Sequence, residues 1–486
     1  MMAACPVREE GRRQLAFEAN REMDRQILSE IWTSDESYNV LRELCDDIGH
    51  RFGGSESERE GAEFLKRKMQ EYGLENVRIE EFPMAGWDRG SAYLKLVEPV
   101  EREFPVIAMP YCPSADITAE IIDVGEGELA DFERLGDQVK GKIVISAAET
   151  NKPGERKSHR TDKFGWAIQY GAVAHIFVNQ NPGMLRITGS ITGRNPGGST
   201  AADREAPIPG VGVSWEAGSA ILRLIERTNG QGKIHLKLEN RTFDSVSRNV
   251  IGEIVGTEHK DDEIILIGGH FDGHDISQGA GDDGAGTITG LEAGRALAKL
   301  KGKLKRTVRV ICFGSEEIGL LGAFHHARTT DPDSYRFVMN LDGAGRGQGG
   351  QEQLVLSGWP ELREWVEQWS KENHYELTVD DQLNSHSDHY PFALRGVPNG
   401  TLNSKDRTAG LIGRGYGHTE ADTFDKIHLR GLQMSAIAVA RLSLAMSQAD
   451  DFPAKRRTED EVREQLKKNN LLERAERAGR FPAKQA

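Results

Sequence analysis

The sequence predicts an α/β protein with a mainly parallel mixed sheet flanked by helices, and with a smaller β-rich unit inserted into it. After residue 249, short apolar runs alternate with segments of helical periodicity, which is typical of a parallel sheet covered by helices. Between residues 112 and 242 the pattern changes to short alternating segments, which favours a compact unit rich in strands. Because helices precede this unit and the strand–helix series follows it, we interpret it as an insertion into one larger domain.

Residues 1–111 are expected to form the N-terminal part of the larger domain. Ser55 and Glu58 have capping-box spacing, and apolar side chains at helical intervals follow them up to Gly73, a residue that commonly ends helices. The segments predicted here are a charged helical lead-in at 1–33, helices at about 34–48 and 55–72, and a strand at 77–82.

The predicted insertion spans residues 112–242 and consists mainly of short strands. One helical stretch, at 164–170, interrupts them, and a Pro- and Gly-rich connection precedes the segment PIPGVGVS. The strands predicted here lie at 117–125, 140–146, 172–179, 207–214 and 232–239.

Residues 243–450 are predicted to form the C-terminal part of the larger domain, and the charged tail at 451–486 is predicted to be helical. Continuous apolar runs indicate buried strands, and helical segments of ordinary length separate them. The strands predicted here lie at 263–269, 307–313, 337–341 and 353–357, and the helices at 287–300, about 317–329 and 362–369.

The composition excludes some classes of function. Lys and Arg total 62 against 76 Asp and Glu, which gives a net charge of −14 and a pI of about 5.6. A general nucleic-acid or anionic-membrane binder would carry a basic face, which this balance disfavours. Glycine is enriched, with 54 residues and no Gly-X-Y period, so its excess needs a local explanation.

The sequence favours a cytoplasmic location. No apolar stretch approaches the ~18–20 residues of a membrane span, and the first residues lack the apolar core of a secretory signal. The cysteines lie far apart without CxxC spacing, which is typical of a reducing compartment, and Cys312 in an apolar run is expected to be buried. The four cysteines are Cys5, Cys45, Cys112 and Cys312.

Side chains that can bind a metal follow the apolar strands of the C-terminal part. Ligands in open α/β sheets bind beyond the carboxyl ends of the strands, so these side chains should gather at one edge. They are His270 and Asp272 after the first strand, Glu316 and Glu317 after the second, Asp342 after the third, Asp282 and Asp283 in the loop GAGDDGAG, and His418 in YGHTEADTFDK.

Each of these features also has a structural interpretation. A histidine at a strand end is commonly structural, and two acids at the start of a helix commonly interact with its dipole. Gly-rich loops are usually turns or, in some proteins, phosphate-binding loops. The pattern GxGxxG is absent, and the two aspartates of GAGDDGAG would repel a phosphate, so a nucleotide site is disfavoured there.

Taken together, the residues favour a metal-dependent hydrolase. His270, Asp282, Glu317, Asp342 and His418 supply two imidazoles and three carboxylates, which suits two zinc ions if one carboxylate bridges them. Asp282 is the best bridge because the glycines around it allow close approach. Zinc lowers the pKa of bound water towards ~7, and Glu316 could take its proton and pass it to a leaving amine. Asp272 could orient the imidazole of His270.

These residues resemble those of the co-catalytic zinc exopeptidases related to aminopeptidase Y and bacterial leucyl aminopeptidase, and within that family the carboxypeptidase Q branch. The resemblance is carried by His-x-Asp, Gly-x-x-Asp-x-x-x-Gly, Glu-Glu, Asp and a late His before Asp-Thr, and by the stretches IGHRFGGSESEREGAEFL and NVIGEIVGTE. It covers most of residues 35–430. It implies a phosphorylase/hydrolase-like zinc-exopeptidase fold and two Zn²⁺ ions.

The resemblance also implies a role for each site residue. Asp282 would bridge the ions, Glu317 and His418 would complete one site, and His270 and Asp342 the other, with Glu316 as base. The stretches VKGKIVI, YGAVAHIFVN and PIPGVGVS resemble a protease-associated domain, which commonly shapes substrate access. Members of the carboxypeptidase Q branch are secreted, so the cytoplasmic expectation departs from the resemblance.

Several further residues have open roles. Asp388 and His389 in SHSDHYPF resemble a segment near the family's active site, and a structural role is an equal alternative. Tyr416 could donate a hydrogen bond to an oxyanion. Four further histidines and one aspartate are expected not to be ligands, namely His274, Asp275, His325, His326 and His386.

The favoured hypothesis is a metallo-exopeptidase that hydrolyses dipeptides or removes N-terminal residues. The alternatives are a hydrolase of another amide, such as an N-acyl amino acid, or a cyclase, and an inactive binding protein on the same scaffold. Arg407 and Arg414 could bind a substrate carboxylate, although exposed arginines without that role are the more common case. The expected partner is a peptide, with no nucleic acid or membrane, and a homodimer is compatible with the sequence.

Overall fold

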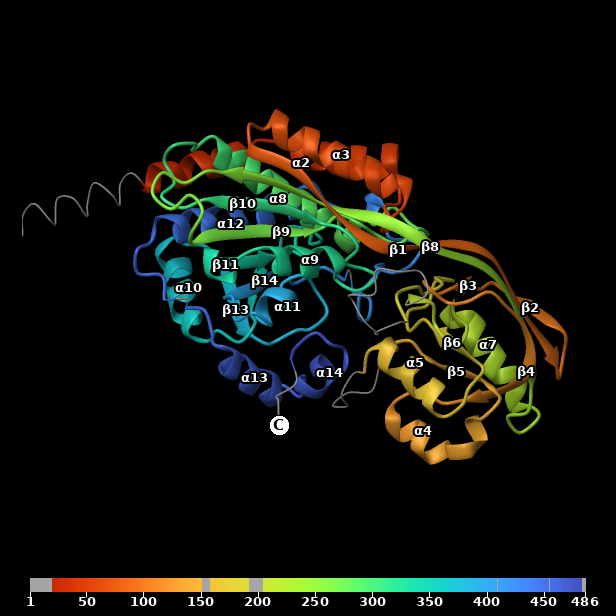
Figure 1. Ribbon diagram of the computed structural model, residues 1–486. Coiled ribbons are helices and arrows are strands. Elements are labelled where there is room, and N and C mark those ends of the chain that lie inside the picture. Colours follow the sequence, from red (N-terminus) through yellow and green to blue (C-terminus); the bar gives the residue numbers. More distant parts are fainter. Residues whose placement is uncertain (1–19, 151–157, 192–203, 409, 454, 483–486) are drawn as a thin grey trace, which may run out of the picture.

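A twisted mixed sheet runs through the protein and links a larger, helix-covered part to a smaller unit (Figure 1). The structure is a computed structural model, and it describes residues 20–150, 158–191, 204–408, 410–453 and 455–482. Within these residues, 14 strands form the sheet, whose main path has the order β13-β12-β14-β11-β9-β10-β8-β4-β5-β6-β7-β3. The predicted α/β class with a mainly parallel mixed sheet is confirmed.

Parallel strands form the centre of the larger part. β9 (Ile264–His270) lies between β10 (Val308–Phe313) and β11 (Tyr335–Asn340) and is parallel to both. β14 (Asn399–Ser404), β12 (Glu352–Leu356) and β13 (Leu377–Asp381) extend the sheet on one side. Since parallel strands end at the same edge, the segments that follow β9, β10 and β11 lie next to one another.

Helices cover both faces of this sheet. Alternate residues of β9 point to opposite faces, so Ile265 and Ile267 pack in the main core, while Ile264 and Leu266 pack in a smaller cluster. The helices of the main core are α2 (Glu36–Glu43), α3 (Glu56–Glu71), α8 (Ala285–Ala298), α10 (Glu361–Glu372) and α12 (Leu429–Gln448). The smaller cluster contains α9 (Leu321–Thr329) and α11 (Tyr390–Ala393).

Two long antiparallel strands, β1 (Glu75–Glu98) and β8 (Lys233–Ile254), connect the two parts. The predicted strands at 77–82 and 232–239 are only segments of them. Pro83, Gly86 and other turn-forming residues in β1 weaken the sequence pattern of a strand. Gly86 has a packing reason, because a Cβ atom there would lie 2.5 Å from the ring of Phe243 on β8.

The smaller unit is an α/β layer of its own. Its strands β4 (Ala115–Asp123), β5 (Ile143–Ala147), β6 (Ala174–Val178) and β7 (Gly210–Val213) are parallel, and β3 (Ile107–Ala108) pairs with β7. Its helices are α4 (Leu129–Leu135), α5 (Arg160–Gln169) and α7 (Trp215–Glu226). The sequence pattern indicated the strands and α5 but missed α4 and α7.

The helix predicted at 317–329 begins four residues later, at Leu321. Ser315 and Leu320 have positive φ angles of 56° and 62°, which a helix does not contain, so residues 316–320 form a turn. The sequence analysis also missed β13, β14 and α12. The predicted helical tail forms two short helices, α13 (Glu459–Lys468) and α14 (Leu472–Arg477), which pack against α9 and α11.

Several other predictions concern the chain as a whole. Residues 20–32 of the lead-in are helical, and its first 19 residues, with Cys5, lie outside the described residues. Cys45, Cys112 and Cys312 are buried free cysteines, as expected for Cys312. In the described part of the chain, no helix combines the length and apolar character needed to cross a membrane. The domain boundaries at 112, 242 and 450, the cytoplasmic location and the homodimer stay predictions.

Candidate active site and metal centre

The carboxyl ends of three neighbouring strands bring the predicted site residues together. His270 is the last residue of β9, Glu316 follows β10, and Asp342 follows β11. The Nε2 atom of His270 lies 3.9 Å from Oε2 of Glu316. The arrangement follows from parallel pairing, which places strand ends of distant sequence segments at one edge of the sheet.

Asp282 lies at the centre of the site, with one carboxylate oxygen towards each predicted histidine ligand. Oδ1 is 3.6 Å from Nε2 of His270, and Oδ2 is 3.5 Å from Nε2 of His418. The Asp282–Asp283 peptide bond is cis. Gly417 allows this approach, because a Cβ atom there would lie 2.8 Å from Oδ2 of Asp282.

Two groups of side chains are arranged so that each could hold a metal ion. In each group the candidate ligand atoms lie within 4.8 Å of one another. The first group is His270, Asp282 and Asp342, and the second is His274, Glu317 and His418. The structure thus brings all five predicted ligands together and adds His274, which the sequence analysis had set aside.

His274 is a full member of the second group by geometry. Its Nε2 atom lies 3.2 Å from Oε2 of Glu317, and Nε2 of His418 lies 2.9 Å from the same oxygen. The rings of His274 and His418 meet edge to face, with centroids 4.5 Å apart. Its position four residues after His270 can be read from the sequence, but the sequence does not show the turn that brings the His274 side chain back to the site.

The adjacent carboxyls of Glu316 and Glu317 are in opposite electrostatic environments. Burial raises the pKa of Glu316 well above its usual value, and the imidazole of His270 only partly opposes this. Burial also acts to raise the pKa of Glu317, but His274 and His418 hold it well below its usual value. Neighbouring carboxyls with separated pKa values are typical of sites that divide proton transfer from charge stabilisation.

Asp272 holds the turn that carries these two glutamates. Its Oδ1 accepts a hydrogen bond from the backbone N–H of Glu316 at 2.9 Å, and its Oδ2 accepts one from Glu317 at 3.3 Å. The Nδ1 atom of His270 lies 3.1 Å from the backbone carbonyl of Asp272 and 3.5 Å from the carboxylate. Asp272 therefore orients His270 and also fixes the Glu316–Glu317 turn, which the sequence did not indicate.

Asp422 and Ser387 support two of the carboxylates. The carboxylate of Asp422 accepts hydrogen bonds from the backbone N–H groups of Gly281 and Asp282, at 2.7 and 2.9 Å. The hydroxyl of Ser387 donates to Oδ2 of Asp342 at 2.8 Å. Such supporting hydrogen bonds orient metal ligands and tune their basicity.

The inserted unit contributes directly to the site. The Nδ1 atom of His418 lies 3.1 Å from the backbone carbonyl of Thr188, and the backbone N–H of Thr188 donates to the carbonyl of His418 at 2.9 Å. The side-chain amide of Asn181 donates to the carbonyl of Ile412 at 2.9 Å. Because Nδ1 faces a carbonyl, the Nε2 atom of His418 is the one left for the metal group.

The donor set fits a divalent cation. Within the described residues, Oδ2 of Asp282, Oε1 of Glu317 and both ring nitrogens of His274 are buried without a hydrogen-bond partner. The guanidinium of Arg346 lies 2.8 Å from Asp282 and 3.0 Å from Asp342, so these carboxylates already attract positive charge. Imidazole nitrogens with carboxylate oxygens are the ligands that zinc prefers in catalytic sites.

Comparison with protein families finds two matches. Residues 249–443 match Peptidase family M28, and residues 107–221 match the PA domain. Over residues 249–443 the chain is therefore similar to peptidases of family M28. The family match contains all five predicted ligands, together with His274 and both glutamates, and the PA match contains Thr188. The predicted resemblance to this family, with an inserted protease-associated domain, is confirmed.

Individual relatives agree with the family assignment. Carboxypeptidase Q of Mus musculus is 28% identical over 312 residues, which cover 63% of this chain and 64% of that protein. The structure of the peptidase M28 precursor from Shewanella amazonensis SB2B has a TM-score of 0.76 at 23% identity, over 91% of this chain and 99% of that one. BSAP, a zinc aminopeptidase from Bacillus subtilis, has a TM-score of 0.63 at 22% identity, over 86% and 98%. These two structures share the fold.

Other residues considered in the sequence lie in well-defined surroundings. Asp275 pairs with Arg89 at 2.6 Å, and His326 lies 3.0 Å from Glu80, whereas the ring of His325 stacks on Phe82. The expectation that these three residues are not metal ligands stays a prediction.

The SHSDHYPF segment contacts the candidate site through its serine. Its Ser387, not Asp388 or His389, contacts a candidate ligand. Asp388 is buried, both of its oxygens lack a hydrogen-bond partner among the described residues, and burial raises its pKa well above the usual value. The ring of His389 contacts Asn384 and Thr401.

Three further residues were left open by the sequence. The ring of Tyr416 lies 5.3 Å from the ammonium of Lys426, and the guanidinium of Arg407 contacts Asn403. Arg414 lies at the site itself, with Nη1 3.1 Å from Nε2 of His418. Of the two arginines considered for a substrate carboxylate, Arg414 is thus the one beside the candidate ligands.

Proposed function

We propose that this chain is a zinc-dependent metallo-exopeptidase that hydrolyses dipeptides or removes N-terminal residues. The observation that carries the proposal is the placement of Asp282, whose two oxygens face His270 and His418 separately. A carboxylate in this position can bridge two ions. The match to a peptidase family, and the carboxypeptidase and aminopeptidase names of similar proteins, support a peptide bond as the target.

Each proposed zinc site combines one shared and several separate ligands. His270 and Asp342 would hold one ion, Glu317 and His418 the other, and Asp282 both. We add His274 to the second site, since it lies as close to Glu317 as a ligand of the same ion would. Zinc bound here would supply a Lewis acid and lower the pKa of a bound water towards ~7.

Glu316 is the proposed general base. Its carboxylate takes a proton from the attacking water and later gives it to the leaving amine, which is the usual course of general acid–base catalysis. Asp272 fixes the backbone of Glu316 and so sets the direction of this carboxylate. Burial of the site excludes bulk water, which strengthens the electrostatic interactions within it.

Replacement of Glu316 tests the role of the base separately from metal binding. We expect Glu316→Gln to retain its zinc and to lose peptidase activity by about 10²- to 10⁴-fold, the usual contribution of a general base. Glu60→Gln, at an exposed position of α3, provides a control with the same change in charge. A Glu316→Gln protein with full zinc content and unchanged kcat would refute the mechanism.

A substrate panel separates the proposal from its alternatives. Free dipeptides, the same dipeptides with either terminus blocked, aminoacyl anilides and N-acyl amino acids are assayed with and without chelator. Turnover of N-acyl amino acids alone would favour a hydrolase of another amide. A protein that binds peptides but holds no metal and turns over none of the panel would favour an inactive binding protein.

A further inference from the structure

A large cavity opens beside the candidate metal centre. It has a volume of about 1140 Å³, and Glu316, Glu317 and His418 form one side of it. Helix α5 of the inserted unit and helix α14 with the residues after it form further walls, and Figure 1 shows α14 next to α5. A peptide whose scissile bond lies at Glu316 would place its remaining residues against these walls.

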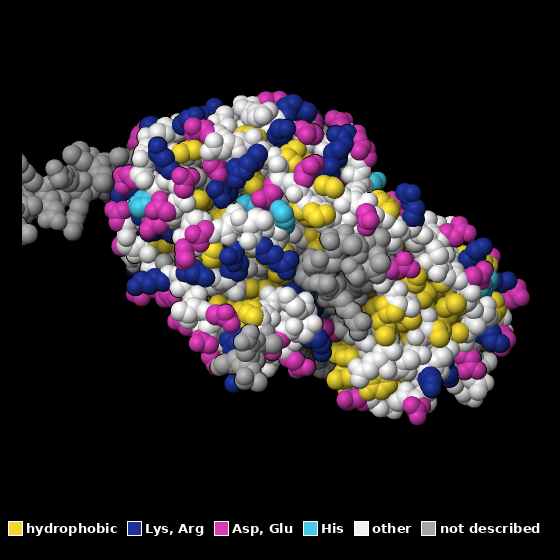
Figure 2. Space-filling view, viewed as in Figure 1, with side chains coloured by type: hydrophobic (Ala, Val, Ile, Leu, Met, Phe, Trp, Pro, Cys, Tyr) yellow, Lys and Arg dark blue, Asp and Glu magenta, His cyan; other side chains and the backbone are white. Residues whose placement is uncertain are grey.

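Arginines dominate the described lining of this cavity. It contains six of them against four carboxyls, two of which are Glu316 and Glu317 of the candidate centre. The protein as a whole carries a net charge of −14, so the positive charge of this wall is opposite in sign to the net charge of the protein. On the face seen in Figure 2, by comparison, side chains of both signs are interspersed. The lining arginines are Arg160, Arg204, Arg414, Arg474, Arg477 and Arg480.

Several of these guanidinium groups have unused hydrogen-bonding capacity. Within the described residues, no carboxylate forms an ion pair with Arg160, Arg204 or Arg480, and Nε of Arg204 and of Arg480 is buried without a partner. Nε of Arg160 donates to the carbonyl of Ser190 at 2.9 Å, which leaves its terminal nitrogens. Arg160 and Arg204 are buried and Arg480 is half-buried. Buried arginines are rare unless they are paired, so these groups suit an anionic ligand.

Two stacked histidines in the same cavity wall lie near these positively charged arginines. The rings of His159 and His386 lie with centroids 4.7 Å apart, and Nε2 of His386 is buried without a partner in the described part of the chain. Burial, together with the arginines around it, lowers the pKa of His386 to about 3. Burial and the neighbouring arginines also lower the pKa of His159 well below its usual value, so the positive charge of this wall comes from the arginines.

We propose that this arginine wall binds a carboxylate of the peptide substrate, with Arg160 and Arg480 as its main donors. The inference rests on the proposed function, because it assigns the substrate class of the same cavity. A guanidinium presents paired N–H donors that match the two oxygens of a carboxylate. A basic wall in a cleft also raises the local concentration of anionic substrates. The group is either the α-carboxylate of a short peptide or an acidic side chain.

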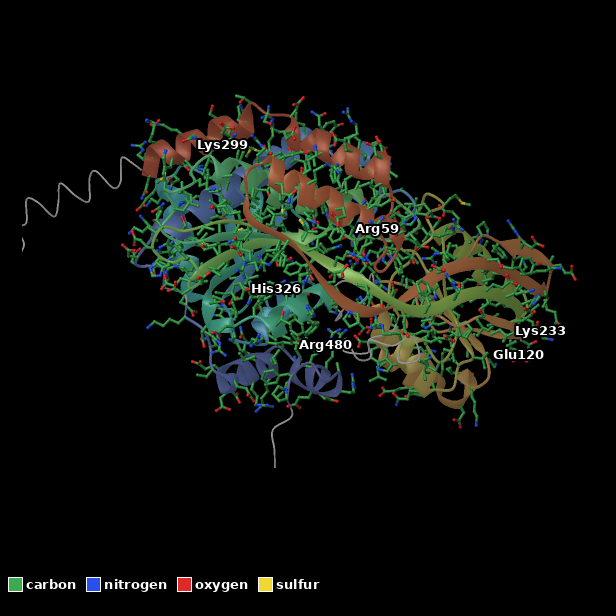
Figure 3. The ribbon with its side chains drawn as sticks, turned by 45° about the horizontal axis from the view of Figure 1, so that its top comes forward. Arg59, Glu120, Lys233, Lys299, His326 and Arg480 are labelled. Carbon is green, nitrogen blue, oxygen red and sulfur yellow. The ribbon has the colours of Figure 1, made fainter. Side chains whose placement is uncertain are left out.

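Arg474 positions the tail that carries Arg480. Its guanidinium lies 3.6 Å from the carboxylate of Asp162 and 3.4 Å from the hydroxyl of Thr161, both on α5. These contacts fasten α14 to the inserted unit. Figure 3 labels Arg480, which lies where the C-terminal helices approach that unit. The tail is thus part of the substrate site and not only a surface appendage.

Calorimetry with the zinc-loaded Glu316→Gln protein tests the inference without depending on turnover. We expect Ala-Ala to bind at least about 10-fold more tightly than Ala-Ala amide, because charge-assisted hydrogen bonds would be lost with the carboxylate. Adding Arg480→Gln or Arg160→Gln should weaken Ala-Ala by about 10- to 100-fold and leave the amide within about threefold. Arg480→Lys, which keeps the charge, should recover part of the loss.

A second pair of ligands identifies the carboxylate. If Ala-Glu amide, and not Ala-Gln amide, depends on Arg480, the wall binds an acidic side chain; if only Ala-Ala does, it binds the α-carboxylate. Lys468→Gln, at an exposed position of the tail outside the cavity, controls for the loss of one positive charge. Thermal unfolding of each variant confirms that it is folded.

The outcomes for the two proposals differ. Equal binding within both ligand pairs (Ala-Ala against its amide, and Ala-Glu amide against Ala-Gln amide), or binding of all carboxylate ligands unchanged in both arginine variants, overturns the inference, while peptide turnover by the wild-type protein supports the function. If the wild-type zinc protein hydrolyses no peptide, the proposed function is overturned. Carboxylate binding that depends on the arginines would then still support the inference about the arginine wall.

Discussion

Replacement of Arg51 should destabilise the protein and its metal centre together. The side chain is completely buried in the larger part, below the loop that carries Asp282. Its guanidinium donates four hydrogen bonds to backbone carbonyls: 2.6 Å to Phe271, 2.6 Å to Gly49, 2.7 Å to Gln278 and 3.0 Å to Gly279. It therefore joins the segment between His270 and Asp272 to the loop before Asp282.

The size of the effect follows from these four contacts. Arg51→Met keeps most of the volume but leaves four carbonyls without their donor, at about 1–3 kcal/mol for each that stays buried and unpaired. Removing a buried charge recovers several kcal/mol of desolvation, so the net loss should be about 3–5 kcal/mol. Because the loop then loosens, zinc affinity should fall by about 10- to 100-fold.

Urea unfolding and equilibrium zinc binding measure the two effects. Arg59→Met is the matched control, because Arg59 lies on the exposed surface of α3 and pairs with Glu56, and a change within about 0.5 kcal/mol is expected there. If Arg51→Met stayed within 0.5 kcal/mol of the wild-type protein, or lost stability without losing zinc affinity, the link between Arg51 and the site would be refuted.

Three further changes probe other parts of the molecule. Arg346→Met should lower the free energy of unfolding of the zinc-free protein by about 3–5 kcal/mol. The loss should be smaller in the zinc-loaded protein, because the ions replace the charge of Arg346 beside Asp282; equal losses in urea unfolding would contradict this. Gly417→Ala should lower zinc affinity by about 10- to 100-fold in equilibrium dialysis, because its Cβ would lie 2.8 Å from Oδ2 of Asp282, whereas Gly165→Ala, with nothing within 4 Å, should not. Burial raises the pKa of Glu352 to about 8 in the folded state, so the folded protein holds a proton that the unfolded chain has lost, and stability should fall as the pH rises from about 4.5 to 8. Glu352→Gln should weaken this fall, and urea unfolding at pH 5 and pH 8 should show a larger relative gain for the variant at pH 8.

The central strands and the residues at their ends were predictable because their pattern is local. A continuous apolar run followed by a histidine or an acid indicates both a buried strand and the edge at which it ends, as for His270 and Asp342. Parallel pairing then brings such ends together without any further sequence signal. His270, Glu317 and Asp342 meet in this way, whereas Asp282 and His418 reach the site from loops. The sequence could not show that Oδ1 and Oδ2 of Asp282 face different histidines.

The supporting contacts were not predictable for a different reason. The residues that support the site come from segments far apart in the sequence, namely Arg51, Thr188 and Ser387. In most of their contacts one of the two partners is a backbone carbonyl. Every residue has such a carbonyl, so no residue type marks it. The full lengths of the strands β1 and β8 were missed for a related reason. Their pairing with each other, and not local propensity, stabilises segments that contain proline and glycine.

The PA domain therefore has two roles that its position in the sequence does not reveal. Through Thr188 it fixes the ring of His418, a candidate ligand of the metal centre. Through α5 it provides Arg160 to the cavity wall and the contact that holds Arg474 of the tail. A movement of this domain relative to the larger part would change the geometry of the candidate ligands and of the cavity wall together, so the inserted domain, the tail and the candidate metal centre are structurally coupled.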